Sequence, residues 1–369
     1  MQNLAVNGYT RAEVIAALHN GRRHISFRYD LLDSNEQKIK ALTTVESASI
    51  SMSAFADIKR TAKFNILDDN SINFASDRIQ PFIRLKMPDD SYTEWSQGIF
   101  LLSSPDRSEQ NGNIYRDIEA YDGLQVLNDD KFEDRYAIGV GTNYITAIKE
   151  ILTGAGIIKT NIEPSALTLP ATKEFEPGTT KLSAINSLLA EINFVPIYVD
   201  EIGFYTSMGY AGPDFRAVDY TYSDNELSVI YNGLVDKLDL FSVPNKFIAY
   251  TSNPDSASLR SVYTNTSADS PLSTVSRGRT ITDVRKVDDI ADQTTLDAYV
   301  ARIAFEASQI YGYITAETAI MPFHSVYDVI RIEYSSMGIY EKFTETDWSY
   351  DLSVGAKMKH SLRKVVNIL

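Results

Sequence analysis

Cysteine is absent from this chain of 369 residues, which excludes disulfide bonds, a thiolate nucleophile and any cysteine-ligated zinc. Long apolar runs are absent too: nowhere do about 18 apolar residues follow one another without a charge, so we expect no membrane insertion. The N-terminal residues MQNLAVNGYTRAEV lack the apolar core of a signal peptide. Basic residues are fewer than acidic ones, and the net charge of −14 argues against binding of nucleic acid or anionic membranes through overall charge.

Catalytic and cofactor motifs are also missing. The sequence contains no G-x-S-x-G, no Walker A motif and no dinucleotide fingerprint. Gly139-Val-Gly141-Thr142 precedes an expected helix, but without a basic residue it indicates a glycine turn rather than a phosphate site. The acidic clusters at Asp68-Asp69 and Asn128-Asp129-Asp130 lack the glycine and final glutamate of a calcium loop. We therefore predict no cofactor site, no catalytic residues and no enzymatic activity.

Histidine is rare, and its positions do not form a ligand motif. A zinc site commonly places two histidines at a fixed helical spacing, as in H-E-x-x-H. Here any metal site would need ligands from distant parts of the chain, so we predict none. The four histidines are His19, His24, His324 and His360.

What the sequence does contain is typical of a globular protein rich in strands. Apolar residues make up 44% of the chain and charged residues 23%, and tyrosine and phenylalanine are abundant. Residues 1–135 predict a short helix after the capping box Thr10-Arg-Ala-Glu13, then an antiparallel barrel or sandwich. Pro88-Asp-Asp90 and Gln110-Asn111-Gly112 are the clearest hairpin turns.

Residues 136–225 have a different pattern, which predicts a small α/β module inserted between two strand-rich regions. Thr142 or Asn143 caps one helix, and Thr180 caps a second. Asp200-Glu-Ile-Gly203 predicts a hairpin after the second helix.

Residues 226–369 predict a second strand-rich domain with one long helix. The segment 251–279 is dense in serine and threonine and indicates an exposed loop. A helix over about 294–311 follows, with Thr294 as N-cap and Gly312 as its stop. After it, period-two alternation predicts long strands, and in the strand 340–352 it places Glu345 and Asp347 on the same side. The predicted fold class is therefore α+β and strand-rich.

A series of phrases resembles the baseplate hub, or tail-hub, proteins of long-tailed phages and prophages, of the Gram-positive type. The series runs in order along most of the chain, and its specificity lies in that order because no single phrase is a catalytic signature. The phrases are WSQGIFLLSSPDR (95–107), IEAYDGLQVLNDDKFEDRY (118–136), LSAINSLLAEINFVPIYVDEIG (182–203), VPNKFIAYTSNPD (243–255), TVSRGRTITDVR (274–285), ADQTTLDAYVARIAFEASQIY (291–311), TAIMPFHSVYDVIRIEYSSMGI (318–339) and WSYDLSVGAKMKHSLRKVV (348–366).

The resemblance implies a structural protein of the virion tail tip, assembled in the bacterial host cytoplasm. Such hubs form homotrimers in which each chain gives two tube-type β domains to a ring, so three chains match the six-fold tail tube and a three-fold tip. The implied partners are the distal tail or tail tube protein, the tape measure protein and a tail-tip spike or fibre protein. DNA would pass through the ring during ejection without specific binding, as part of the host cell attachment complex.

Two alternatives stay open from the sequence. The first is a tail-associated carbohydrate-active enzyme or saccharide-binding module, since a glycosidase needs only two carboxylates and the chain has 49 acidic residues. The second is a hub of a phage-derived injection device, which has the same geometry. If the chain forms a channel, we predict that acidic residues of its C-terminal strands line the wall and repel phosphate: Glu317, Glu333, Glu345 and Asp347.

Overall fold

The computed structural model describes residues 1–103, 105–192, 194–225, 228–238, 241–251, 258–287, 293–308 and 310–366. Its contacts divide the chain into two compact units. The first comprises residues 1–233 and 316–361, and the second comprises 234–315 and 362–369. The three-part domain division at 135 and 225 and the tube-type architecture remain predictions.

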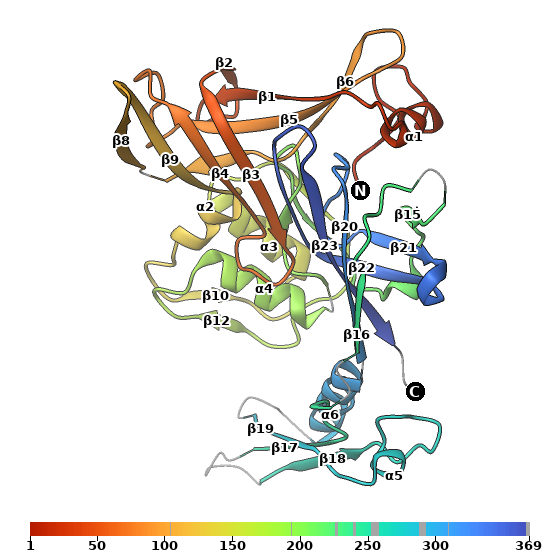
Figure 1. Cartoon of the computed structure of the whole chain (residues 1–369). Helices are drawn as coiled ribbons and strands as arrows, with labels where there is room; N and C mark the ends of the chain where they lie inside the picture. The colour runs from red at the N-terminus through yellow and green to blue at the C-terminus, as the bar shows by residue number, and fades with distance from the viewer. Residues whose placement is uncertain are drawn as a thin grey trace. The chain divides into compact units, whose positions relative to one another are not determined.

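The N-terminal part of the first unit is an antiparallel sheet with a leading helix (Figure 1). Thr10 and Glu13 form the predicted capping box of α1 (Arg11–His19), and both predicted hairpin turns are present, with Asp90 and Asn111 at positive φ. Strand β5 alternates strictly between buried and half-buried residues because one face covers the core. The strands are β1 (Ile25–Leu32), β2 (Lys38–Leu42), β3 (Val45–Ser53), β4 (Arg60–Leu67), β5 (Arg78–Lys86), β6 (Tyr92–Ser96), β7 (Phe100–Leu102), β8 (Asp106–Gln110) and β9 (Asn113–Tyr121).

A helical module, residues 124–207, follows in the same unit. Asn143 and Thr180 cap its two longer helices, as the sequence predicts, and their apolar faces share one core with the short helix α2. Figure 1 shows these helices beside the pair β10–β12. The elements are α2 (Leu124–Asp129), β10 (Tyr136–Ile138), α3 (Tyr144–Gly154), β11 (Thr160–Ile162), β12 (Lys173–Phe175), α4 (Lys181–Glu191), β13 (Tyr198–Val199) and β14 (Tyr205–Ser207).

The C-terminal strands join the N-terminal sheet into one continuous sheet. From β20 its path runs β20-β23-β22-β3-β4-β9-β7-β5-β1-β2, with β21 paired to β22 and β15 paired to β21. The junction is the antiparallel pair of β22 and β3, in which Trp348 lies opposite Met52 and Tyr350 opposite Ile50. The elements are η1 (Pro213–Phe215), β15 (Tyr220–Ser223), β20 (Ile310–Ala319), β21 (Val329–Tyr334), η2 (Ser335–Met337), β22 (Ile339–Asp351) and β23 (Lys357–Val366).

The second unit has its own small core between one helix and a three-stranded sheet. Leu296, Val300 and Ile303 on α6 pack against Phe247 and Ala249 on β17, the central strand. Strand β17 pairs antiparallel with β18 and parallel with β19. The elements are β16 (Val235–Leu238), β17 (Lys246–Tyr250), β18 (Arg260–Thr264), α5 (Thr274–Arg277), β19 (Thr282–Lys286) and α6 (Gln293–Ser308).

The fold confirms a strand-rich α+β class but corrects details of the second unit. The expected loop 251–279 contains β18 and α5 among its described residues, and Ser270 and Ser273 are buried because their hydroxyls bond within the segment. Helix α6 begins at Gln293 and ends at Ser308, so Thr294 is not its cap. Gly312 lies inside β20, where it pairs with Leu238 rather than stopping a helix. No helix in the described part of the chain is long and apolar enough to cross a membrane.

Candidate functional site: a buried His–Glu–His centre

The alternation of buried residues along strand β22 is interrupted partway along its length. In its first half Phe343 and Glu345 are buried, whereas in its second half the buried residues are Thr346, Trp348 and Tyr350. The change falls where β22 stops pairing with β21, after Thr344, and starts pairing with β3, at Asp347. Glu345 and Thr346 are consecutive and both buried at this point, so the side chain of Glu345 lies in the protein interior.

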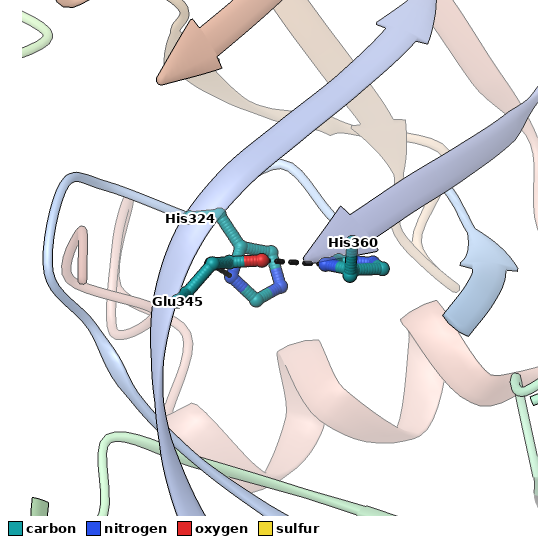
Figure 2. Close-up of side chains that lie close together, drawn as sticks. All are labelled: His324, Glu345 and His360. Carbon is teal, nitrogen blue, oxygen red and sulfur yellow. Dashed lines mark hydrogen bonds and ion pairs between the residues drawn. The ribbon is translucent and has the colours of Figure 1, made fainter. Parts of the chain in front are cut away.

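Glu345 meets two histidines there. His324 comes from the segment between β20 and β21, and His360 from β23 (Figure 2). Nδ1 of His360 lies 2.5 Å from Oε1 of Glu345, and Nδ1 of His324 lies 2.6 Å from its Oε2. The exposed fractions of His324, Glu345 and His360 are 2%, 0% and 3%, so the three side chains form a closed centre. We refer to these three residues as the His–Glu–His centre.

A hydroxyl group contacts the far ring nitrogen of each histidine. The hydroxyl of Tyr222, on β15, lies 2.6 Å from Nε2 of His324, and their rings stack at an interplanar angle of 9°. Oγ1 of Thr318, on β20, lies 2.8 Å from Nε2 of His360. Both imidazole rings are thereby fixed, each with Nδ1 turned toward the carboxylate.

The electrostatics of the centre favour an ionised glutamate. Burial alone would raise the pKa of Glu345, but His324 and His360 lower it to about 2. Burial lowers the pKa of His360, an effect that Glu345 partly opposes. Asp328, whose Oδ2 lies 3.9 Å from Nδ1 of His324, has its pKa raised to about 6 by burial. Chemically the centre offers two imidazole nitrogens and a carboxylate but no exposed surface for a substrate.

The predicted channel-lining residues occupy different environments. Lys357 Nζ donates to Glu317 at 2.7 Å, and the hydroxyl of Thr346 donates to the half-buried Asp347 at 2.9 Å. Glu333 accepts from Ser223 and from Arg331, both at 2.8 Å. Glu345 is enclosed by its own chain, so its expected position on a channel wall is corrected. Strict alternation placed it beside Asp347, but the alternation is interrupted at Glu345 and Thr346, which are both buried.

Sequence reasoning did not find the His–Glu–His centre. Its members lie on separate segments, so no local motif connects them, and only the topology of β20, β22 and β23 brings them together. One signal was present in the last strand. Met358, His360 and Leu362 occupy the buried side of β23, and a histidine in an otherwise apolar row needs a polar partner inside the protein.

The opposite, exposed side of the same sheet forms a shallow polar groove of about 380 Å³. Small hydroxyl side chains pair across the junction of β3 and β22, where Ser51 lies opposite Ser349. Because side chains alternate along a strand, Asp347 shares this side with Ser349. We call this surface the open face; the residues lining its groove are Ser49, Ile50, Ser51, Thr61, Ala62, Lys63, Glu119, Ala120, Tyr121, Ser349, Tyr350, Asp351, Lys357 and Lys359.

Solved structures with the same fold include tail proteins from bacteria and from their prophages. A tail protein from Neisseria meningitidis MC58 matches with a TM-score of 0.67 at 12% identity, over 92% of this chain and 97% of that one. The 43 kDa tail protein of prophage MuSo2 from Shewanella oneidensis matches with a TM-score of 0.64 at 11% identity, over 91% and 98%. Prophage tail protein gp18 from Listeria monocytogenes matches with a TM-score of 0.54 at 14% identity, over 93% and 95%.

These matches show a shared fold over nearly the whole length of each protein. No protein family matches the chain by sequence, and no curated protein does so either. The similarity therefore shows the fold of this chain alone. It does not favour the Gram-positive type, because Neisseria and Shewanella proteins match as well as the Listeria one.

Proposed function

We propose that the chain is a structural, non-enzymatic protein of a phage or prophage tail and forms the hub of its baseplate or tail tip. The observation that carries this proposal is the match to three tail proteins over at least 91% of this chain and at least 95% of each of theirs. Such complete coverage means that the whole chain, rather than one widespread domain, has the architecture of a tail component.

The working unit of this proposal is a homotrimeric ring. Residues 1–135 and 226–369 would supply two tube-type domains per chain, with the module 136–225 inserted between them. Three chains would then present six similar domains to the tail tube and three-fold symmetry to the tip. The proposed partners are the distal tail or tube protein, the tape measure protein and a spike or fibre protein.

The proposal also assigns the open face to the channel wall. Basic and acidic residues together line two grooves on this face. The basic residues are Lys63, Lys357 and Lys359, and the acidic residues are Glu46, Asp117, Glu119 and Asp351. Between them lie short serine and threonine hydroxyls, so the surface carries nearly balanced charge and few long apolar side chains. Of the predicted wall residues, Asp347 shares this face, and Glu317 reaches it through its ion pair with Lys357. DNA could pass such a wall without strong attraction.

Measurement of the oligomeric state tests the proposed hub. Light scattering coupled to size exclusion should give a mass of three times the 41.3 kDa chain, alone or after addition of the adjoining tail tube protein. Electron microscopy of that species should show a ring with a central opening. A chain that stays monomeric with every neighbouring tail protein would contradict the proposal.

A charge reversal tests the open face separately. In the trimer, Glu317→Lys with Asp347→Lys should produce binding to duplex DNA at low salt, because the wall becomes basic. The matched control is Glu133→Lys with Asp134→Lys, two exposed residues whose reversal changes net charge equally. Equal DNA binding by both double variants would show that overall charge, rather than the open face, is responsible.

A further inference from the structure

The hydrogen bonds of His360 determine where its ring proton lies. Thr318 has one hydroxyl proton, and its Oγ1 donates to the carbonyl oxygen of Ala319 at 2.9 Å. At the 2.8 Å contact with Thr318, therefore, Nε2 of His360 is the donor. A neutral imidazole has only one N–H, so Nδ1 of His360 carries a lone pair. Oε1 of Glu345 lies 2.5 Å from this atom, so the contact needs either a second ring proton, which would make the ring an imidazolium, or a metal ion between the two atoms.

His324 has the same arrangement on the other carboxylate oxygen. Its Nδ1 lies 2.6 Å from Oε2 of Glu345, and neither atom has another hydrogen-bond partner in the described part of the chain. Both side chains are at least nine-tenths buried. Unpaired polar atoms in such a position cost free energy unless something else satisfies them.

We propose that the His–Glu–His centre binds one divalent transition-metal ion of the zinc class, through Nδ1 of His324, Nδ1 of His360 and the carboxylate of Glu345. One ligand atom from each residue lies within 4.8 Å of the others. Two imidazoles and a carboxylate suit zinc, whereas calcium and magnesium prefer oxygen ligands throughout. The hydroxyls of Tyr222 and Thr318 hold the far ring nitrogens in the manner of outer ligands at zinc sites.

Binding requires only a small opening of the centre. Zinc–ligand bonds of about 2.0–2.2 Å in a tetrahedral arrangement separate neighbouring ligand atoms by roughly 3.4 Å, so the present nitrogen–oxygen contacts would widen by nearly 1 Å. A fourth ligand is available from the second oxygen of Glu345. Oδ2 of Asp328 also lies 3.9 Å from Nδ1 of His324, but it accepts a hydrogen bond from the backbone N–H of Ser325, and its Oδ1 pairs with the N-terminal ammonium group.

The ion would have a structural role. It would link β22, β23 and the segment before β21, which are distant in sequence, and the burial of all three ligands leaves no position for a substrate. Metal binding to a site that exists only in the folded chain contributes directly to folding.

The test is to unfold the purified full chain in chelator, refold it with or without equimolar zinc, and measure bound metal by mass spectrometry. We expect one tightly held zinc per chain and a Tm several degrees higher than without metal, whereas magnesium and calcium give neither effect. Cobalt(II) in place of zinc should give the intense visible absorption of a tetrahedral site, a readout that needs no variant.

Glu345→Gln and His360→Gln should lose the bound metal and the metal-dependent rise in Tm, while the exposed control His24→Gln keeps both. Cobalt absorption of the wild-type chain decides the matter if these variants do not fold. Refolded wild-type chain without bound metal and with unchanged Tm would overturn the proposal. So would equal metal retention by His360→Gln, because the metal would then be bound elsewhere.

Discussion

The helical module and the His–Glu–His centre belong to the same unit but are stabilised in opposite ways. The module's core is a continuous apolar cluster in which Leu182, Ile185 and Leu189 of α4 pack against the apolar face of α3. The centre has three ionisable side chains in an equally closed space. Apolar contacts are non-directional and tolerate small shifts, whereas buried polar groups depend on every partner being present.

One buried carboxylate in each region allows the two kinds of environment to be compared through the pKa. Asp122, at the start of the helical module, accepts hydrogen bonds from the backbone N–H groups of Arg60 and Leu124, at 2.8 and 2.9 Å. Burial nevertheless raises its pKa to about 6, whereas the pKa of Glu345 falls to about 2. Two adjacent imidazoles therefore outweigh burial at Glu345, and two backbone donors do not outweigh it at Asp122.

The largest effect is expected from Glu345→Ala. Removing the carboxylate leaves His324 and His360 facing an empty space without their common partner, and breaking a buried pair in this way costs about 3–5 kcal/mol. Urea unfolding monitored by circular dichroism measures the loss. Asp351→Ala, an exposed position on the same strand, is the control and should change stability by less than about 0.5 kcal/mol. A cost for Glu345→Ala as small as that of the control would contradict the description of the centre as interdependent.

Leu189→Ala tests the apolar core of the helical module. Leu189 is fully buried in the helical module, so its truncation should destabilise the chain by about 2–5 kcal/mol through lost transfer energy and a residual cavity. The same unfolding assay applies, with the half-exposed Leu167→Ala as control. A loss below about 1 kcal/mol would mean that the helix repacks around the missing side chain.

The contrast also explains which parts could be predicted from the sequence. Helices α3 and α4 follow from caps and apolar spacing within a dozen residues, and the caps Asn143 and Thr180 are where the pattern puts them. The His–Glu–His centre depends on an interruption of the alternation in β22 where its partner strand changes. The local sequence pattern does not reveal such an interruption, so regular alternation assigned Glu345 to the side of Asp347.

The prediction of an exposed loop over residues 251–279 was wrong for a related reason. Serine and threonine are common in exposed loops, but here Ser270 and Ser273 are buried because each forms hydrogen bonds within the segment. Composition alone cannot distinguish a solvated hydroxyl from one bonded inside the protein. Gly312 shows the same limit, since glycine ends many helices but also fits a strand.

The smallest of the three effects concerns Asp122 and depends on pH. Its pKa is about 6 in the folded chain, against the ordinary value of 3.8 that applies to the unfolded chain, so the folded state binds the proton more tightly. Stability therefore falls as pH rises from about 4 to above 6, and each tenfold difference in proton affinity is worth about 1.4 kcal/mol. The ionised Asp122 should thus cost about 3 kcal/mol at neutral pH.

Asp122→Asn isolates this contribution, because the amide does not ionise. Other buried groups such as Asp328 also titrate near pH 6, so the quantity to measure is the stability of the variant minus that of the wild type, by urea unfolding at several pH values. This difference should move in favour of the variant by about 2.4 kcal/mol between pH 4 and pH 7. A constant penalty is expected in addition, because the amide nitrogen cannot accept from a backbone N–H, but it does not vary with pH. If the stability difference between variant and wild type does not change with pH, the backbone donors do offset the burial of Asp122. The pKa of Asp122 would then not be raised, and the pKa values of Asp122 and Glu345 would not be shifted in opposite directions.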